Sequence, residues 1–136
     1  MLAGQAQKEF FVNEALCVLD ALNARAVTAS QPAPPAVPAA GSSYRITANA
    51  TGAWAGQDDR IAVMIGGEWR FIAPPEGLLL FDRAAGSLII YRSQWEPAAA
   101  IAAPSGGTVV DIEARATLTS LIAALETMGV LDALPA

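Results

Sequence analysis

The sequence predicts an α+β fold: an N-terminal helix, a small antiparallel β-sheet of about five strands built from hairpins, and a C-terminal amphipathic helix. Three observations support this prediction. Between Ile61 and Trp95, two pairs of apolar runs are each broken by a short turn signal, which is typical of β-hairpins. Both ends of the chain carry helical spacing of apolar residues. Connectors rich in proline, alanine or glycine separate these parts.

The first segment, residues 1–29, is predicted to be helical from about Gln5 to Asn23. Val12, Leu16 and Leu19 recur at steps of four and three residues, which places them on one face of a helix. Residues 30–42 then contain four prolines, which remove backbone donors and favour extended polyproline geometry. We interpret this segment as a linker.

Residues 43–97 are predicted to form the β-domain. Ser43–Thr47 alternates as a short strand, and a second hairpin lies between Leu78 and Tyr91. Its turn does not define a register, so no cross-strand partners are assigned.

The first hairpin turns at Gly66-Gly67, a pair that tolerates positive φ. This turn places Ile65 opposite Glu68, Met64 opposite Trp69 and Ala62 opposite Phe71. Both faces of the hairpin then carry apolar side chains. We therefore expect both faces to be covered, and the terminal helices are the available covers.

Residues 98–107 are predicted to be a second linker, and residues 108–136 contain the C-terminal helix. The helix is expected to start at Thr108, with Asp111 as another possible cap, and to end at Gly129. The candidate oligomer-interface residues form a stripe on each predicted helix: Val12, Leu16 and Leu19 on the first, and Leu118, Leu121, Ile122, Leu125 and Met128 on the second.

Composition narrows the possible partners. The chain is 54% hydrophobic and 15% charged, which favours apolar surface covered by partner chains. The net charge is −5 and Lys8 is the only lysine, so nucleic-acid binding is not expected. The sequence contains no apolar run of membrane-spanning length, so we expect no membrane insertion. It also has no secretory signal pattern, so we expect the protein to be made in the cytoplasm.

The sequence lacks the residue types that most catalytic mechanisms need. The chain has no histidine, and its single cysteine, Cys17, is expected to be a buried packing residue. We therefore predict no enzyme activity, no catalytic residues, no cofactor and no metal. A carboxylate pair could still hydrolyse a glycoside, but the spacing of the candidates selects no pair. These candidates are Asp58, Asp59, Glu68, Glu76 and Asp82.

The aromatic residues suggest a second possible activity. Trp54, Trp95 and Tyr91 lie in or beside the predicted sheet, and exposed aromatic rings on small β-domains often stack on sugars. They are the candidate glycan-binding residues. The alternative is that they form the core of the sheet.

Two motifs resemble a known family. The first is Ala6-Gln7-Lys8-Glu9 followed by Asn13-Glu14-Ala15-Leu16 and Leu19-Asp20. The second is Thr51-Gly52-Ala53-Trp54-Ala55-Gly56 followed by the run Gly67–Gly77, which reads GEWRFIAPPEG. Together they resemble a domain family of unassigned biochemical function that recurs in phage tail-fibre-like proteins and phage-derived gene transfer agents.

The resemblance implies a structural or attachment component of a virion or phage-like particle, of tail-fibre, spike or adaptor type. It also implies a homo-oligomer, with a trimer favoured, and contacts with other particle proteins. The alternative is a carbohydrate-binding module for bacterial surface polysaccharide. The linkers fit an assembly because they would let the helices reach neighbouring subunits.

Overall fold

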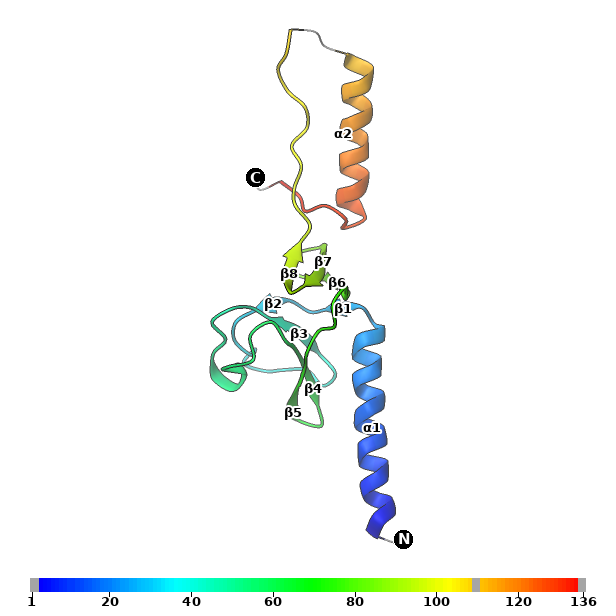
Figure 1. The fold of residues 1–136 in the computed structure, drawn as a ribbon, viewed down its shortest axis with the longest axis vertical. Helices are drawn as coiled ribbons and strands as arrows, with labels where there is room; N and C mark the ends of the chain where they lie inside the picture. Colours follow the sequence, from blue (N-terminus) through cyan, green and yellow to red (C-terminus); the bar gives the residue numbers. More distant parts are fainter. Residues whose placement is uncertain (1–2, 109–110, 135–136) are drawn as a thin grey trace.

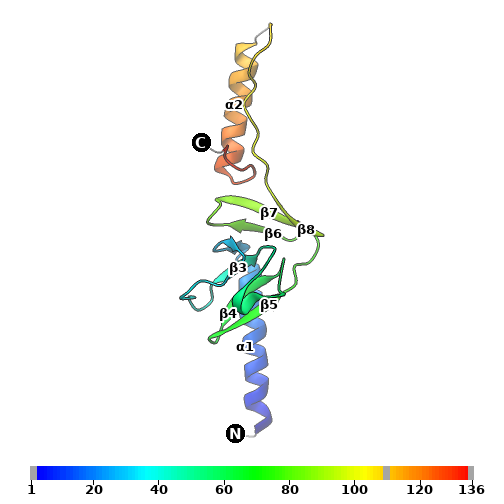
Figure 2. The same cartoon turned by 90° about the vertical axis from the view of Figure 1, so that its left-hand side faces the viewer.

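The computed structural model describes residues 3–108 and 111–134. The molecule is elongated, with a helix at each end and the strands between them (Figures 1 and 2). The helices are α1 (Ala3–Asn23) and α2 (Ile112–Thr127), and η1 (Gly52–Trp54) is a short 3-10 turn. The strands are β1 (Ala26–Val27), β2 (Ser30–Gln31), β3 (Ser43–Ile46), β4 (Ile61–Ile65), β5 (Glu68–Ile72), β6 (Leu79–Asp82), β7 (Ser87–Arg92) and β8 (Gln94–Pro97).

The α+β class is confirmed, but the strands form two sheets rather than one. Their orders are β1-β6-β7-β8 and β2-β3-β4-β5. The pairs β1–β6 and β2–β3 are parallel and the others antiparallel. The chain crosses between the sheets just before Ser30, through strands of two residues each. Such short strands show no alternation, so the sequence did not predict them.

The register predicted for the first hairpin is confirmed. Ile65 pairs with Glu68, Met64 with Trp69 and Ala62 with Phe71. Gly66 and Gly67 have φ of 60° and 83°, the positive values that a two-residue turn of this kind requires.

Both faces of β4 are buried, as expected, but the expected covers are wrong. Ile61 and Val63 pack against the other sheet, in a core with Val27, Leu80, Ile89 and Trp95. Ala62, on the opposite face, lies in a second core with Tyr44, Ile46 and Trp54. The covers are therefore a second sheet and the loop that carries Trp54. Two packed sheets bury more of these short strands than one helix crossing could.

The second hairpin has a register that the structure now defines. Leu80 pairs with Ile89 and Asp82 with Ser87. Asp82 closes the turn because its Oδ1 accepts hydrogen bonds from the amides of Ala84 and Ala85, at 2.9 and 3.0 Å. The strand β8, which extends this sheet, was not predicted.

The proline-rich segment packs on the β-body and is not the free linker expected at residues 30–42. The Thr51 amide donates to the Pro32 carbonyl at 2.9 Å, and the Gly41 amide donates to the Met64 carbonyl at 2.8 Å. Pro34, Pro35 and Pro38 are half-buried, whereas Pro32 is exposed. By contrast, residues 101–107 are exposed, as expected for a connector.

Helix α2 begins at Ile112 with Asp111 as its N-cap, not at Thr108. The Asp111 side chain accepts a hydrogen bond from the Ala114 amide at 2.9 Å, which satisfies one of the unpaired donors of the first turn. The helix ends as predicted at Gly129, whose φ is 70°. The Gly129 amide then donates to Glu126 and the Val130 amide to Leu125, the two bonds of a Schellman cap. No helix within residues 3–108 and 111–134 is both long and apolar enough to span a bilayer.

Candidate interaction surface on the two helices

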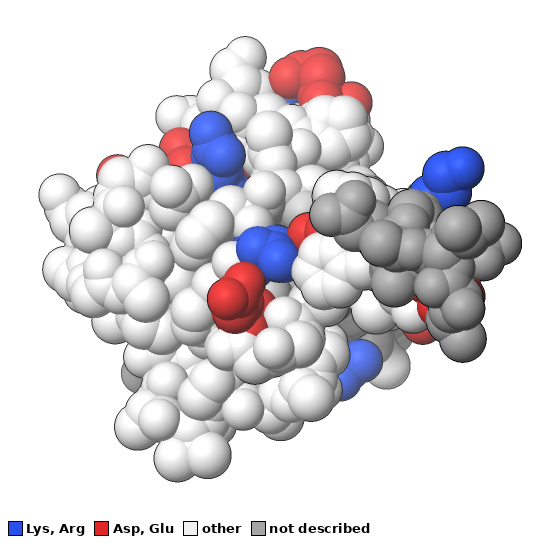
Figure 3. Space-filling model, turned by 90° about the horizontal axis from the view of Figure 1, so that it is seen from below, with Lys and Arg blue, Asp and Glu red and all other residues white. Residues whose placement is uncertain are grey.

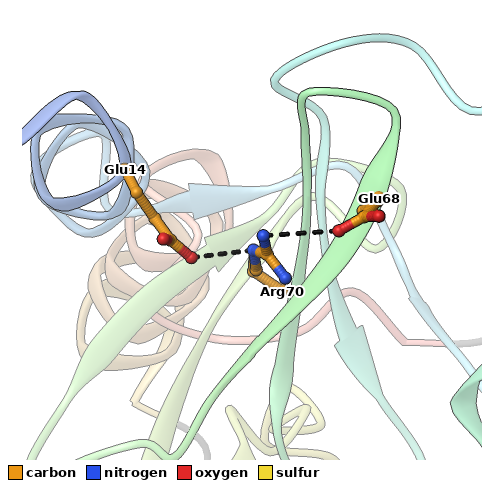
Figure 4. A network of polar contacts seen from close by, with 3 residues as sticks. All are labelled: Glu14, Glu68 and Arg70. Carbon is orange, nitrogen blue, oxygen red and sulfur yellow. Dashed lines mark ion pairs between the residues drawn. The ribbon is translucent and has the colours of Figure 1, made fainter. Parts of the chain in front are cut away.

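One flank of α1 is fixed to the β4–β5 hairpin. The Glu14 carboxylate of α1 lies 2.8 Å from Nε of Arg70, and Nη2 of the same arginine lies 3.3 Å from the Glu68 carboxylate (Figure 4). The Glu14 contact is an ion pair without a directed hydrogen bond, because the Arg70 Nε–H has no aligned acceptor. Glu14 and Val18 are the half-buried positions on this flank.

The opposite flank of α1 carries the predicted apolar stripe. Each residue of an α-helix turns by about 100°, so Val12, Leu16 and Leu19 lie on the side away from Glu14. The structure leaves all three 57–61% exposed. The sequence was thus right that these residues form one face, and in the single chain that face has no cover.

The exposed apolar surface of α1 is wider than the stripe. Phe10 and Phe11 are also more than half exposed, and their rings meet edge to face with centroids 6.0 Å apart. A helix that is apolar on several sides is normally buried. The helical spacing did not select these phenylalanines as interface candidates, although the unbroken apolar run Phe10–Val12 indicates a wider apolar surface.

Helix α2 leaves its predicted stripe open as well. Leu118, Leu121 and Met128 are 47–71% exposed, whereas Ile122 and Leu125 are half-buried. No residue of the helix is fully buried. All the candidate interface side chains are thus at least partly exposed in the single chain.

Unlike the helix stripes, the candidate glycan-binding residues have little exposed surface. The sequence left open whether Trp54 and Trp95 are exposed for sugar stacking or form the core. They are 0% and 6% exposed, so both lie in the core. The Trp95 indole N–H donates to the Asp59 carbonyl at 2.7 Å, which orients the ring inward. Tyr91 is half-buried and packs edge to face on Trp95, with centroids 5.3 Å apart. Neither indole can offer its face to a sugar in this conformation.

Trp54 is the centre of an aromatic cluster. Its ring centroid lies 5.0 Å from that of Trp69 and 5.6 Å from that of Tyr44. Among the described residues, its buried indole N–H has no hydrogen-bond acceptor. The ring therefore acts as apolar packing, which is the alternative that the sequence left open.

Several candidate carboxylates have structural roles. Asp58 accepts hydrogen bonds from the amides of Asn49 and Ala50, and Glu76 accepts one from the Ser93 amide. These contacts close loops of the β-body. The positive φ of Asn49 and Ser93, 61° and 59°, shows how sharply the chain turns where these carboxylates bind.

A charged group is enclosed near the junction of the two sheets. Burial lowers the pKa of Arg45, and the nearby carboxylates of Asp59 and Asp82 act in the opposite direction. Asp82 is itself buried and accepts a hydrogen bond from the Ser30 hydroxyl. Because Ser30 and Asp82 belong to different sheets, this bond joins them.

Hollows border α1 on the body side. One of them, of about 630 Å³, is lined by Cys17, Asp20 and Arg83 among others, and a neighbouring one of about 350 Å³ shares Cys17 and Ile65 with it. Cys17 is exposed here, so its expected burial is wrong. Within the described residues, no three His, Cys, Asp or Glu side chains lie together as metal ligands would.

Charge does not mark a nucleic-acid surface on the face seen from the α1 end. Figure 3 shows isolated basic and acidic side chains among uncharged ones there. Phosphate binding depends on clustered basic residues.

The fold and the exposed stripes define a class: a small α+β domain with an amphipathic helix at each end. The chain belongs to the family described as a protein of unknown function, DUF2793, whose family model matches residues 12–96. The matched region runs from the α1 stripe through β8, and α2 lies beyond it. A search of curated proteins found no match.

Proposed function

We propose that this protein is a structural or attachment component of a phage or phage-like particle and works as a homo-oligomer, with three copies favoured. The observation that carries the proposal is the pair of uncovered apolar stripes on α1 and α2. The resemblance of the two sequence motifs to tail-fibre-like and gene-transfer-agent proteins supports the particle.

Burial of the two stripes would favour self-association. Burying a Leu or Val side chain contributes roughly 1.5–3 kcal/mol if the side chain starts fully exposed, and about half of that for these half-exposed residues. Several such residues on each helix would together offset part of the entropy lost on association.

Variants on the stripes test the oligomer. We expect Leu16→Glu and Leu121→Glu to lower the mass in solution, because each places a charge where the neighbouring copy would pack. Ser120→Glu is the matched control, since Ser120 is exposed and lies away from the α2 stripe. Light scattering at micromolar concentration measures the mass. An unchanged mass in both leucine variants would count against the stripes as the interface.

Particle composition tests the rest of the proposal. Particles purified from the source cells should contain the protein at a fixed ratio to the capsid protein. If intact particles lack it while the cell extract contains it, the particle role is refuted, whatever the oligomeric state. Capsid and tail genes beside its gene would support the same role.

A further inference from the structure

The two helices lie nearly on one line. In Figures 1 and 2, α1 and α2 occupy opposite ends of the molecule and both run along its long axis. In Figure 1 the β2–β5 sheet lies to the left of α1, and the connector that leads to α2 lies to the left of that helix. Both helices therefore have a free flank toward the same side of the molecule.

Each free stripe has the spacing of a helical seam. Val12, Leu16 and Leu19 follow steps of four and three residues. Leu118, Leu121, Leu125 and Met128 follow steps of three, four and three. Alternating three- and four-residue steps place apolar side chains along one line that fits a second helix of the same kind.

Charge does not oppose contact between identical stripes. Glu14 is the only charged residue between Val12 and Leu19, and it turns to Arg70 on the β-body. On α2, Arg115 donates to the carbonyls of Pro104 and Gly106, so it is held toward the connector. Asp20 on α1 and Glu126 on α2 flank the stripes without interrupting their apolar spacing.

A partly exposed leucine of the β-body lies beside the C-terminal end of α1. Leu79 of β6 is 40% exposed and lines a hollow of about 390 Å³ with Leu19 and Leu78. With roughly half of each side chain exposed, the two stripes and Leu79 present on the order of 600 Å² of apolar surface per copy, compared with about 800 Å² per partner in a stable interface. Backbone and polar atoms at the rim would supply the remainder.

We propose that copies of this chain pack side by side in the same direction, about an axis parallel to the long axis, so that α1 meets α1 at one end and α2 meets α2 at the other. This geometry rests on the oligomer of the proposed function. The α1 stripe lies inside residues 12–96, which the family model matches, and α2 lies outside them. Contact between α1 helices and contact between α2 helices are therefore tested separately.

Single cysteines test this geometry. Cys17→Ala removes the native thiol, and Leu19→Cys or Leu121→Cys is then added to that background. After mild oxidation, we expect each of these variants alone to form several-fold more disulfide-linked pairs than Ser120→Cys, which lies on the far side of α2. Ala15→Cys and Thr117→Cys repeat the test beside the stripes without removing a leucine.

The outcomes separate the geometry from the oligomer itself. Cross-links that appear only when Leu19→Cys and Leu121→Cys chains of different length are mixed would overturn same-direction packing in favour of opposite directions. An oligomeric mass without any of these cross-links would overturn the stripes as the interface but leave the oligomer standing. A monomeric mass would refute both.

Discussion

The two tryptophans that resembled sugar-binding residues offer a matched comparison of buried indoles. Trp54 and Trp95 are both buried, but only the Trp95 N–H has a hydrogen-bond acceptor in the described structure. We expect Trp95→Phe to destabilise the protein more than Trp54→Phe. The loss of ring area is common to both changes, so the difference reports the two N–H groups.

The magnitude follows from those groups. Trp95→Phe removes a 2.7 Å hydrogen bond to the Asp59 carbonyl, which costs about 1 kcal/mol and more if that carbonyl stays dry. Trp54→Phe removes a buried N–H that has no acceptor, which relieves a penalty of about 1–3 kcal/mol. The two variants should thus differ by about 2 kcal/mol. Trp54→Ala, which also empties the aromatic cluster, should cost about 3–5 kcal/mol.

Urea unfolding followed by circular dichroism measures these differences. The variants are compared at one protein concentration, because association would contribute to the apparent stability. A shift in the midpoint with an unchanged slope assigns the change to stability. The reasoning is refuted if Trp54→Phe costs as much as Trp95→Phe. In either case, loss of sugar binding in Trp54→Ala would report misfolding rather than a lost contact.

Other perturbations test single features of the fold. Gly129→Ala should lower the free energy of unfolding by about 1–3 kcal/mol, because the φ of Gly129 is 70° and a Cβ there would lie 2.7 Å from an aromatic carbon of β6. Gly41→Ala is the control: Gly41 has a φ of 75° but open space around it, so this change should cost less in the same urea assay. Asp111→Ala should cost α2 about 1 kcal/mol and speed hydrogen exchange in its first turn, and unchanged exchange would contradict the cap. Glu14→Gln should cost under about 1 kcal/mol, because its partner Arg70 is one-third exposed, and a cost that persists at high salt would contradict a screened ion pair.

Local signals in the sequence predicted local structure well. The Gly66-Gly67 turn defined a register because only one pairing fits two residues with positive φ. Gly129 ended α2 for a similar reason, since it accepts the left-handed conformation of a Schellman cap. The sequence offered Thr108 and Asp111 as N-caps of α2, and in the structure Asp111 is the cap.

Long-range packing was beyond the sequence. Strands β1 and β2 have two residues each, which is too short for a periodic pattern, and the parallel partner of β1 lies far along the chain in β6. Without these strands, the division into two sheets could not be seen. The sequence therefore could not predict that a second sheet covers β4, nor decide between the core and the exposed alternative for Trp54 and Trp95, which fill the two cores.

The candidate surface was predicted better than the cores. The helical spacing selected the α1 and α2 stripes correctly, because that spacing needs only the 3.6-residue period of a helix. It could not show that the stripe of α1 faces away from the β-body. That depends on the ion pair of Glu14 with Arg70, two residues far apart in the sequence.

The mass of the unmodified protein in solution tests the central claim most directly. The claim is that other copies of the chain cover the exposed stripes of α1 and α2. Light scattering across micromolar concentrations should then give a multiple of the 14.0 kDa chain, with three copies favoured. A mass of 14.0 kDa at every concentration would contradict the claim.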